Sequence, residues 1–244
     1  MRISRLYTDE SLTEGSTVSL DKAASSYLFK VLRLSEGAEL HLFNGKTVNG
    51  DYGYYSSKIT STGKTVEVTL EKFVSNNNHS PLQITLLQGI SKGDHMDTTI
   101  QKAVELGVTE IIPIICERTV VNLKADRLDK KMRHWHGIAI SACEQSGRNQ
   151  LLTIHQPLKF NDLQLTDGDG FILQPDSSDS ILDSKQTNTV TLLIGPEGGF
   201  SDNEMTLAVD KGFKTVRFGP RVLRTETAAI AAVSILQSLW GDLN

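Results

Sequence analysis

Two glycine-rich loops constrain the fold of this chain more than any other feature. The first reads Gly-Pro-Glu-Gly-Gly over residues 195–199 and follows an apolar run that ends at Ile194. The second, residues 219–227, lies between a short apolar strand and an alanine-rich helix, residues 228–240. Because glycine lacks a Cβ and permits positive φ, Gly195, Gly198 and Gly199 let main chain approach a ligand directly. A tight turn without a ligand explains one such loop, whereas two in tandem predict a single cofactor pocket.

The common phosphate-binding motifs do not match either loop. A P-loop needs Gly-x-x-x-x-Gly-Lys-Ser/Thr, and this order is absent from both. The dinucleotide fingerprint Gly-x-Gly-x-x-Gly is also absent, and the carboxylate of Glu197 would repel a pyrophosphate. The loops therefore indicate a neutral or cationic ligand.

Length and composition indicate a globular protein of two domains. The chain has 244 residues, of which 39% are hydrophobic and 22% charged. It has no apolar run near the ~20 residues of a membrane helix, and its start lacks the apolar core of a signal peptide. Cys116 and Cys143 fit neither a zinc pattern nor a disulfide framework, so we expect buried, reduced thiols, no metal and a cytoplasmic location.

The net charge of −4 conceals an uneven distribution. Residues 118–148 carry seven Lys or Arg against three Asp or Glu, whereas residues 160–210 carry one against ten. Such asymmetry can build a basic face, suited to a nucleic-acid partner, on an acidic protein, or it is only a solvated helix face.

The hydrophobic pattern changes its period along the chain. Residues 1–73 predict a small β-barrel with strands at 16–20, 38–43, 52–59 and 66–70 and a turn at Asn44-Gly45. Residues 21–34 predict a helix whose apolar face carries Ala24, Tyr27, Leu28, Val31 and Leu32. Residues 74–81 break both periods and form a linker.

From residue 82 to 244, strands and helices alternate, which predicts a mostly parallel α/β sheet covered by helices. The expected strands are 84–89, 110–116, 151–154, 170–174, 189–194 and 216–218, and the expected helices are 96–106, 126–145 and 228–240. Both glycine loops then lie beyond the carboxyl ends of strands, where ligands bind in such sheets. The last helix is apolar nearly all round, so it packs against the sheet, the cofactor loop or a second subunit.

The motifs Ile194-Gly195-Pro196-Glu197-Gly198-Gly199 and Gly219-Pro220-Arg221-Val222-Leu223-Arg224-Thr225-Glu226-Thr227 carry a family resemblance. Arg5-Leu6-Tyr7, Val31-Leu32-Arg33, residues 100–108, residues 142–149 and Gly241-Asp242-Leu243 extend it along the whole chain. With these residues, the chain resembles the ribosomal RNA small-subunit methyltransferase E family of the SPOUT superfamily. The resemblance implies a PUA-like barrel over residues 1–73 and a SPOUT α/β domain with a trefoil knot over residues 82–244. It also implies S-adenosylmethionine as cofactor, a homodimer, and methylation of N3 of uridine 1498 in 16S rRNA.

The motifs, the resemblance and the charge distribution together select three sets of site residues. The cofactor set is Leu173, Gln174, Pro175, Ile194, Gly195, Pro196, Glu197, Gly198, Gly199, Phe218, Gly219, Leu223, Arg224, Thr225, Glu226, Thr227 and Ala228. The RNA-binding set is Arg5, Lys30, Arg33, Lys92, Arg118, Lys124, Lys130, Lys131 and Arg133. The catalytic candidates are Glu144, Arg148, Arg224 and Glu226.

Uridine N3 is a poor nucleophile while it is protonated. Arg148 or Arg224 would stabilise the uridine anion, and the proton would leave to a carboxylate or to water. Alternatively, Arg224 and Glu226 form an ion pair that only shapes the loop. The target base must be unpaired or flipped out, and His134 or His136 could stack on it, whereas Trp135 between them is core or a further stacking residue. Two other readings are a methyltransferase acting on tRNA or another rRNA base, and a non-catalytic RNA-binding protein.

Overall fold

The chain forms two compact units in a computed structural model that describes residues 3–63, 65–120, 125–165 and 168–243. The first unit runs to His79 and also contains Cys143–Leu151, whereas the second contains Ser80–Ala142 and the chain from Leu152 onward. The sequence division at residues 74–81 assigned residues 143–151 to the second domain. By their contacts these residues belong to the first unit.

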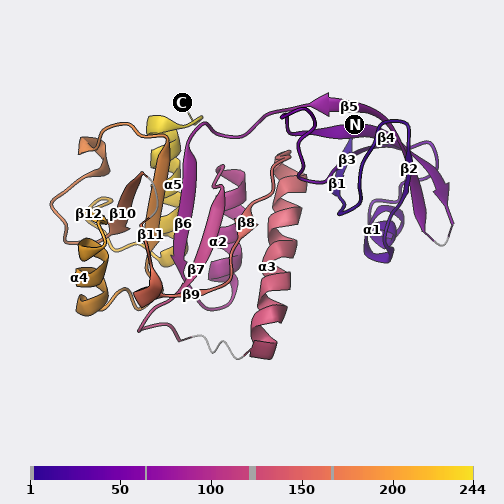
Figure 1. The fold of residues 1–244 in the computed structure, drawn as a ribbon. Helices are drawn as coiled ribbons and strands as arrows, with labels where there is room; N and C mark the ends of the chain where they lie inside the picture. Colours follow the sequence, from indigo (N-terminus) through magenta and orange to yellow (C-terminus); the bar gives the residue numbers. More distant parts are fainter. Residues whose placement is uncertain (1–2, 64, 121–124, 166–167, 244) are drawn as a thin grey trace. The chain divides into compact units, whose positions relative to one another are not determined.

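The first unit is built on a five-stranded sheet in the order β1-β3-β4-β5-β2 (Figure 1). The strands are β1 (Ser4–Tyr7), β2 (Thr17–Ser19), β3 (Glu39–Phe43), β4 (Gly53–Thr62) and β5 (Val66–Ser75). β1 and β3 are parallel and the other pairs antiparallel, so the sheet is mixed. Over the described residues the strands form an open path with β1 and β2 at its ends, and the predicted closed barrel is not seen.

Alternating burial explains these strands. In β5, Val66, Val68 and Leu70 are buried, while the residues between them are exposed or half-buried. The inward residues form one core, which consists of Leu6, Val18, Leu20, Leu28, Leu40, Leu42, Tyr55, Ile59, Val66, Val68 and Leu70. The sequence predicted β2 to β5 but missed β1, an edge strand of four residues.

The predicted helix over residues 21–34 is shorter and less regular than expected. Asp21 caps the helix α1 (Lys22–Ser26) by accepting the main-chain N–H of Ala24 at 2.7 Å, and a π-helical turn follows over Tyr27–Val31. Leu28 is buried as predicted, but Tyr27 and Val31 are 40% and 65% exposed. The prediction for these two was wrong because a π turn contains more residues than an α turn and rotates the positions away from a 3.6-residue period.

The second unit is built on a parallel sheet in the order β12-β10-β11-β6-β7-β8, with β9 also paired to β7. Its strands are β6 (Gln83–Gly89), β7 (Glu110–Ile115), β8 (Thr153–Ile154), β9 (Leu158–Lys159), β10 (Asp169–Leu173), β11 (Thr189–Ile194) and β12 (Lys214–Val216). Its helices are α2 (Asp94–Glu105), most of α3 (Ala125–Ser146), α4 (Asp202–Asp210) and α5 (Thr225–Trp240). The predicted alternation is therefore confirmed.

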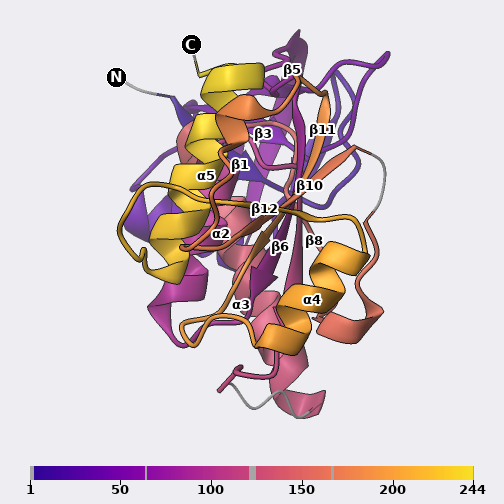
Figure 2. The ribbon, with the colours of Figure 1, turned by 90° about the vertical axis from the view of Figure 1, so that its left-hand side faces the viewer.

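Helices cover both faces of this sheet, with α2 and α5 on one face and α4 on the other (Figure 2). Leu86 packs toward α2 and α5, whereas its neighbour Leu87 belongs to the core that contains Ala208 of α4. The side chain of Gln237 fastens α5, because it accepts from Ser80 Oγ at 2.6 Å and donates to the Leu106 carbonyl at 2.9 Å. Since all strands are parallel, the ends of β6, β10, β11 and β12 meet at one edge of the sheet.

The helix α3 presents a buried stripe made of Met132, Trp135, Ala139, Ala142 and Cys143. Trp135 is only 2% exposed, so it is a core residue and is not available to stack on a base. Its chain neighbours His134 and His136 flank the stripe on either side and are exposed.

Candidate active site

A cavity of about 720 Å³ lies at the carboxyl edge of the parallel sheet. It is bounded by the segments that follow β6, β10, β11 and β12, where open parallel sheets bind ligands. Its lining residues are His95, Leu173, Gln174, Pro175, Ile194, Gly195, Pro196, Glu197, Gly199, Phe200, Asp202, Met205, Val216, Phe218, Gly219, Arg221, Val222, Leu223, Arg224, Thr225, Glu226 and Ala228. The volume is within the range of small-molecule sites, roughly 300–1,000 Å³.

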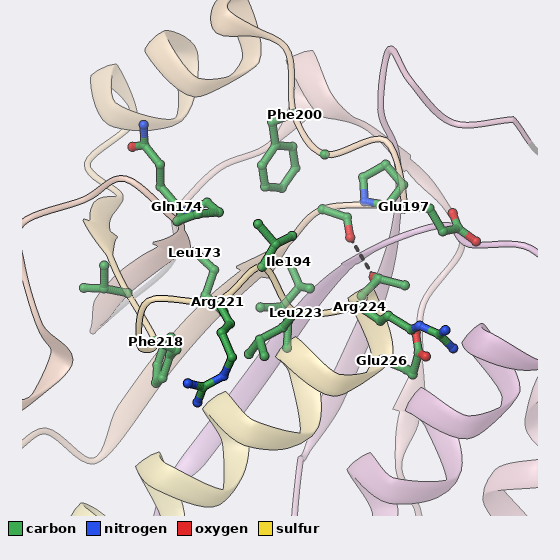
Figure 3. A pocket seen from close by; sticks show the side chains of 18 of the residues that line it. Leu173, Gln174, Ile194, Glu197, Phe200, Phe218, Arg221, Leu223, Arg224 and Glu226 are labelled. Carbon is green, nitrogen blue, oxygen red and sulfur yellow. Dashed lines mark hydrogen bonds between the residues drawn. The ribbon is translucent and has the colours of Figure 1, made fainter.

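The cavity has an apolar interior and a charged margin. Figure 3 shows Leu173, Ile194 and Leu223 close together in its interior, with Phe200 above them. Arg224 and Glu226 lie at the start of α5, drawn in yellow, next to α2, drawn in purple (Figure 3). An apolar slot with a few polar groups at one side suits a ligand that has a flat ring and a charged tail.

Two of the loop glycines are needed for their backbone conformation. Gly199 and Gly219 have φ of 67° and 73°, and a Cβ built on either would project into open space. Because both line the cavity, their missing side chains leave room for a ligand. Gly195 and Gly198, which also permit positive φ, do not adopt it. A Cβ on Gly198 would approach Arg118 Cβ at 3.0 Å, so this glycine makes room for a side chain instead.

Thr225 joins the two loops at the first residue of α5. Its side chain is buried, donates to the Gly195 carbonyl at 2.7 Å and accepts from Gln88 Nε2 at 2.8 Å. Gln88 lies near the end of β6 and Gly195 follows β11, so one hydroxyl connects three segments of the cavity wall.

Two carboxylates hold the first loop in place by accepting main-chain N–H groups. Glu197 accepts the main-chain N–H of Lys92 at 2.8 Å, and Figure 3 shows its carboxylate directed away from Ile194. Glu204 accepts the main-chain N–H groups of Glu117 at 2.7 Å and of Ser201 at 2.9 Å. Glu197 therefore lines the cavity while one of its oxygens binds the main chain of the loop that precedes α2.

Of the predicted cofactor residues, all line the cavity except Gly198 and Thr227. Thr227 is the third residue of α5, and its side chain is exposed. The sequence analysis did not select seven lining residues, which are His95, Phe200, Asp202, Met205, Val216, Arg221 and Val222. The position of His95 at the start of the helix after β6 was a usable signal, since the carboxyl ends of neighbouring strands share an edge.

The four catalytic candidates are divided between the units. Arg224 and Glu226 line the cavity of the second unit, whereas Glu144 and Arg148 belong to the first. Burial raises the pKa of the Glu144 carboxyl above its usual value, against the opposing effects of the Tyr7 main-chain N–H at 2.9 Å and of the Arg5 charge. Arg148 is only 4% exposed.

The predicted RNA-binding residues differ in their surroundings. Arg5 is half-buried, with its guanidinium carbon 4.9 Å and 5.3 Å from the ring centres of Phe43 and Tyr54 and a hydrogen bond to Asn149 at 2.5 Å. Arg118 donates to the Gly198 carbonyl at 3.0 Å. Lys131 is half-buried, with its ammonium 5.8 Å from the Trp135 ring centre, and the exposed members are Lys30, Arg33, Lys92, Arg118, Lys130 and Arg133. Lys124 lies outside the described residues.

Among the described residues, no group of three or more His, Cys, Asp or Glu side chains could hold a metal ion, and no helix is long and apolar enough to span a membrane. Both cysteines are buried free thiols, as predicted.

Comparison with known proteins defines first a class and then a family. A family model described as an RNA methyltransferase domain matches residues 78–237. A methyltransferase of Legionella pneumophila, solved with the bound cofactor SAM, has 40% sequence identity and a TM-score of 0.95, with 100% of both chains covered. With the cavity at the carboxyl edge of its parallel sheet, the chain is thus an α/β RNA methyltransferase.

Two further relatives narrow this class. The ribosomal RNA small subunit methyltransferase E of Neisseria gonorrhoeae, solved with S-adenosyl methionine, is 36% identical with a TM-score of 0.90, and 100% of both chains is covered. The protein of the same name from Buchnera aphidicola subsp. Schizaphis graminum is 38% identical over 247 residues, which cover 100% of this chain and 99% of the relative. The chain belongs to the ribosomal RNA small subunit methyltransferase E family.

Proposed function

We propose that this protein transfers the methyl group of S-adenosylmethionine to N3 of uridine 1498 in the 16S rRNA of the small ribosomal subunit. The observation that carries the proposal is the cavity made by the two glycine loops at the carboxyl edge of the sheet. Relatives that cover the whole chain were solved with this cofactor bound.

The residues of the cavity fit S-adenosylmethionine. Leu173, Ile194 and Leu223 offer apolar surface to an adenine ring, and Gly199 and Gly219 leave the main chain open to it. The carboxylate of Glu226 at the cavity margin favours the cationic part of the molecule. When bound, the cofactor supplies an electrophilic methyl group, and the protein contributes alignment and electrostatics.

The chain's own residues must then prepare the uridine. N3 carries a proton, so the site has to remove it and stabilise the negative charge that spreads over the two carbonyl oxygens. Of the two arginines predicted for this role, Arg224 serves it better than Arg148 because it lines the cavity together with Glu226. Arg148 and Glu144 of the first unit are the second pair of candidates.

The finer architecture belongs to the same proposal. We assign the N-terminal region, residues 1–73, a PUA-like role in holding RNA, with residues 74–81 as linker and residues 82–244 as the methyltransferase domain. A trefoil knot accounts for the position of Thr225, whose side-chain hydrogen bonds join the start of α5 to the ends of β6 and β11. A cytoplasmic homodimer that holds the flipped-out uridine against exposed Lys130 and Arg133 completes the assignment.

Methylation of purified small subunits tests this function. Subunits with unmodified 16S rRNA, large subunits and tRNA would each receive radiolabelled S-adenosylmethionine and the protein, and the nucleosides would be identified by mass spectrometry. We expect 3-methyluridine only in the small subunit, and none when uridine 1498 is replaced by cytidine. Label in tRNA, or in the cytidine variant, would overturn the assignment.

A further inference from the structure

His95 and Glu226 meet at the margin of the cavity although 131 residues separate them in sequence. His95 is the second residue of α2 and Glu226 the second residue of α5, and these helices pack side by side on one face of the sheet. The ring nitrogen Nδ1 of His95 lies 3.1 Å from Oε2 of Glu226. Both side chains line the cavity.

The two side chains differ in exposure, which distinguishes an inner partner from an outer one. The Glu226 side chain is 14% exposed and the His95 side chain 40% exposed, so the carboxylate is the inner partner and the imidazole the outer one. A carboxylate in the first turn of α5 is stabilised by the helix dipole. It can therefore orient the ring through Nδ1, and Nε2 is then the ring nitrogen left to accept a proton.

The contact has ion-pair distance without hydrogen-bond alignment, since Oε2 is buried and has no aligned donor among the described residues. Catalytic hydrogen bonds are commonly long or misaligned before substrate binds and tighten in the complex. Four other charged residues line the same cavity, namely Glu197, Asp202, Arg221 and Arg224, and Asp94 precedes His95 on α2. Of these, Glu197 is engaged by the Lys92 main chain.

We propose that His95, oriented by Glu226, is the group that takes the N3 proton of the target uridine, an inference that rests on the function proposed above. In this step the N3–H bond breaks and an Nε2–H bond forms. The electron pair left on N3 forms the new N–CH3 bond, and the pair of the broken S–CH3 bond remains on sulfur. The positive charge moves from the sulfonium to the imidazolium, where Glu226 stabilises it, and the proton later passes to water.

A matched pair of histidine variants tests the role of His95. His155 is the control, because its Nε2 lies 2.9 Å from Glu110 Oε2 and its side chain is 42% exposed. Glu110 begins β7, so this second pair lies at the amino edge of the sheet. We expect His95→Gln to bind S-adenosylmethionine with wild-type affinity in calorimetry, yet to lose about 10²- to 10⁴-fold in single-turnover methylation. His155→Gln should retain wild-type values in both assays.

A more acidic target base separates proton removal from simple positioning. Small subunits reconstituted with 16S rRNA containing 5-fluorouridine present an N3–H that ionises more readily. If His95 takes the proton, the loss caused by His95→Gln should be at least about tenfold smaller on this substrate, as general-base catalysis requires. An equal loss on both substrates, or near-wild-type methylation of uridine by His95→Gln, overturns the proposal. The wild-type control on uridine reports separately whether the proposed function holds.

The tautomer of the ring provides a readout that does not depend on activity. In long-range ¹H–¹⁵N spectra of the protein, the neutral His95 ring should carry its proton on Nδ1 and leave Nε2 unprotonated. Glu226→Gln should weaken this preference, whereas Glu110→Gln should leave the His95 signals unchanged. A neutral ring protonated on Nε2 in the wild type would exclude His95 as the acceptor.

Discussion

The hydroxyl of Thr225 provides the sharpest test of how the cavity is held together. Thr225→Val keeps the shape and the β-branch of the side chain but removes the bonds to the Gly195 carbonyl and to Gln88 Nε2. Each lost bond costs about 1 kcal/mol net, and a buried carbonyl left without a donor adds roughly another 1 kcal/mol. We therefore expect a loss of about 3 kcal/mol, which lowers the melting temperature of a chain of this length by about 6–12 °C.

The same helix offers the control. Thr227→Val is an identical substitution two residues further along α5, at an exposed position, and should change stability by less than about 0.5 kcal/mol. Scanning calorimetry of both variants gives the stability comparison, and titration calorimetry with S-adenosylmethionine gives the affinity. Because Gly195 lines the cavity, Thr225→Val should also weaken cofactor binding about tenfold or more. Melting temperatures of the two variants that agree within about 1 °C would refute the reasoning.

Three other predictions follow from single residues. Gly219→Val should abolish binding of S-adenosylmethionine in calorimetry, because a β-branched residue is strained at a φ of 73° and its side chain would enter the cavity. Gly50→Val is the control, because its φ of 91° is equally unfavourable for valine but open space surrounds it, and this variant should bind the cofactor normally. Burial raises the pKa of Glu144 above 4.5, so charging it costs stability as pH rises, and the melting temperature of Glu144→Gln relative to wild type should increase from about pH 4 to pH 7. Burial raises the pKa of Cys116 to about 12, so iodoacetamide at about pH 8 should leave it unmodified in the folded protein, as mass spectrometry would show.

The second unit was largely predictable because its signals are local. Apolar runs separated by amphipathic stretches correctly indicated a parallel sheet, and the rule that ligands bind at the carboxyl edge correctly grouped both glycine loops. The strand β1 was missed because four residues with a basic side chain among them have no measurable period. The turn at Tyr27–Val31 was missed because a π-helical turn leaves no signature in a 3.6-residue pattern.

The site was predictable in its outline but not in its contacts. Loop composition selected most of the cavity residues, since glycine and proline there have few structural uses. Sequence alone could not show that Glu197 binds the Lys92 main chain or that His95 reaches Glu226, because each contact joins segments about a hundred residues apart. It also selected Gly198, which is not among the cavity-lining residues and lies against Arg118.

Residues 143–151 belong to the first unit although they follow most of α3 in sequence, and this affects where the chain can be truncated or exchanged with that of a relative. Glu144 receives the Tyr7 main-chain N–H, and Asn149 bonds both Arg5 and the carbonyl of Asn76. A fragment that ended at His79 would lose all three bonds and expose the surface that this returning segment covers. An exchange of N-terminal regions between relatives therefore has to transfer two separate stretches of chain together, and a single crossover between the units in a gene would produce mismatched halves.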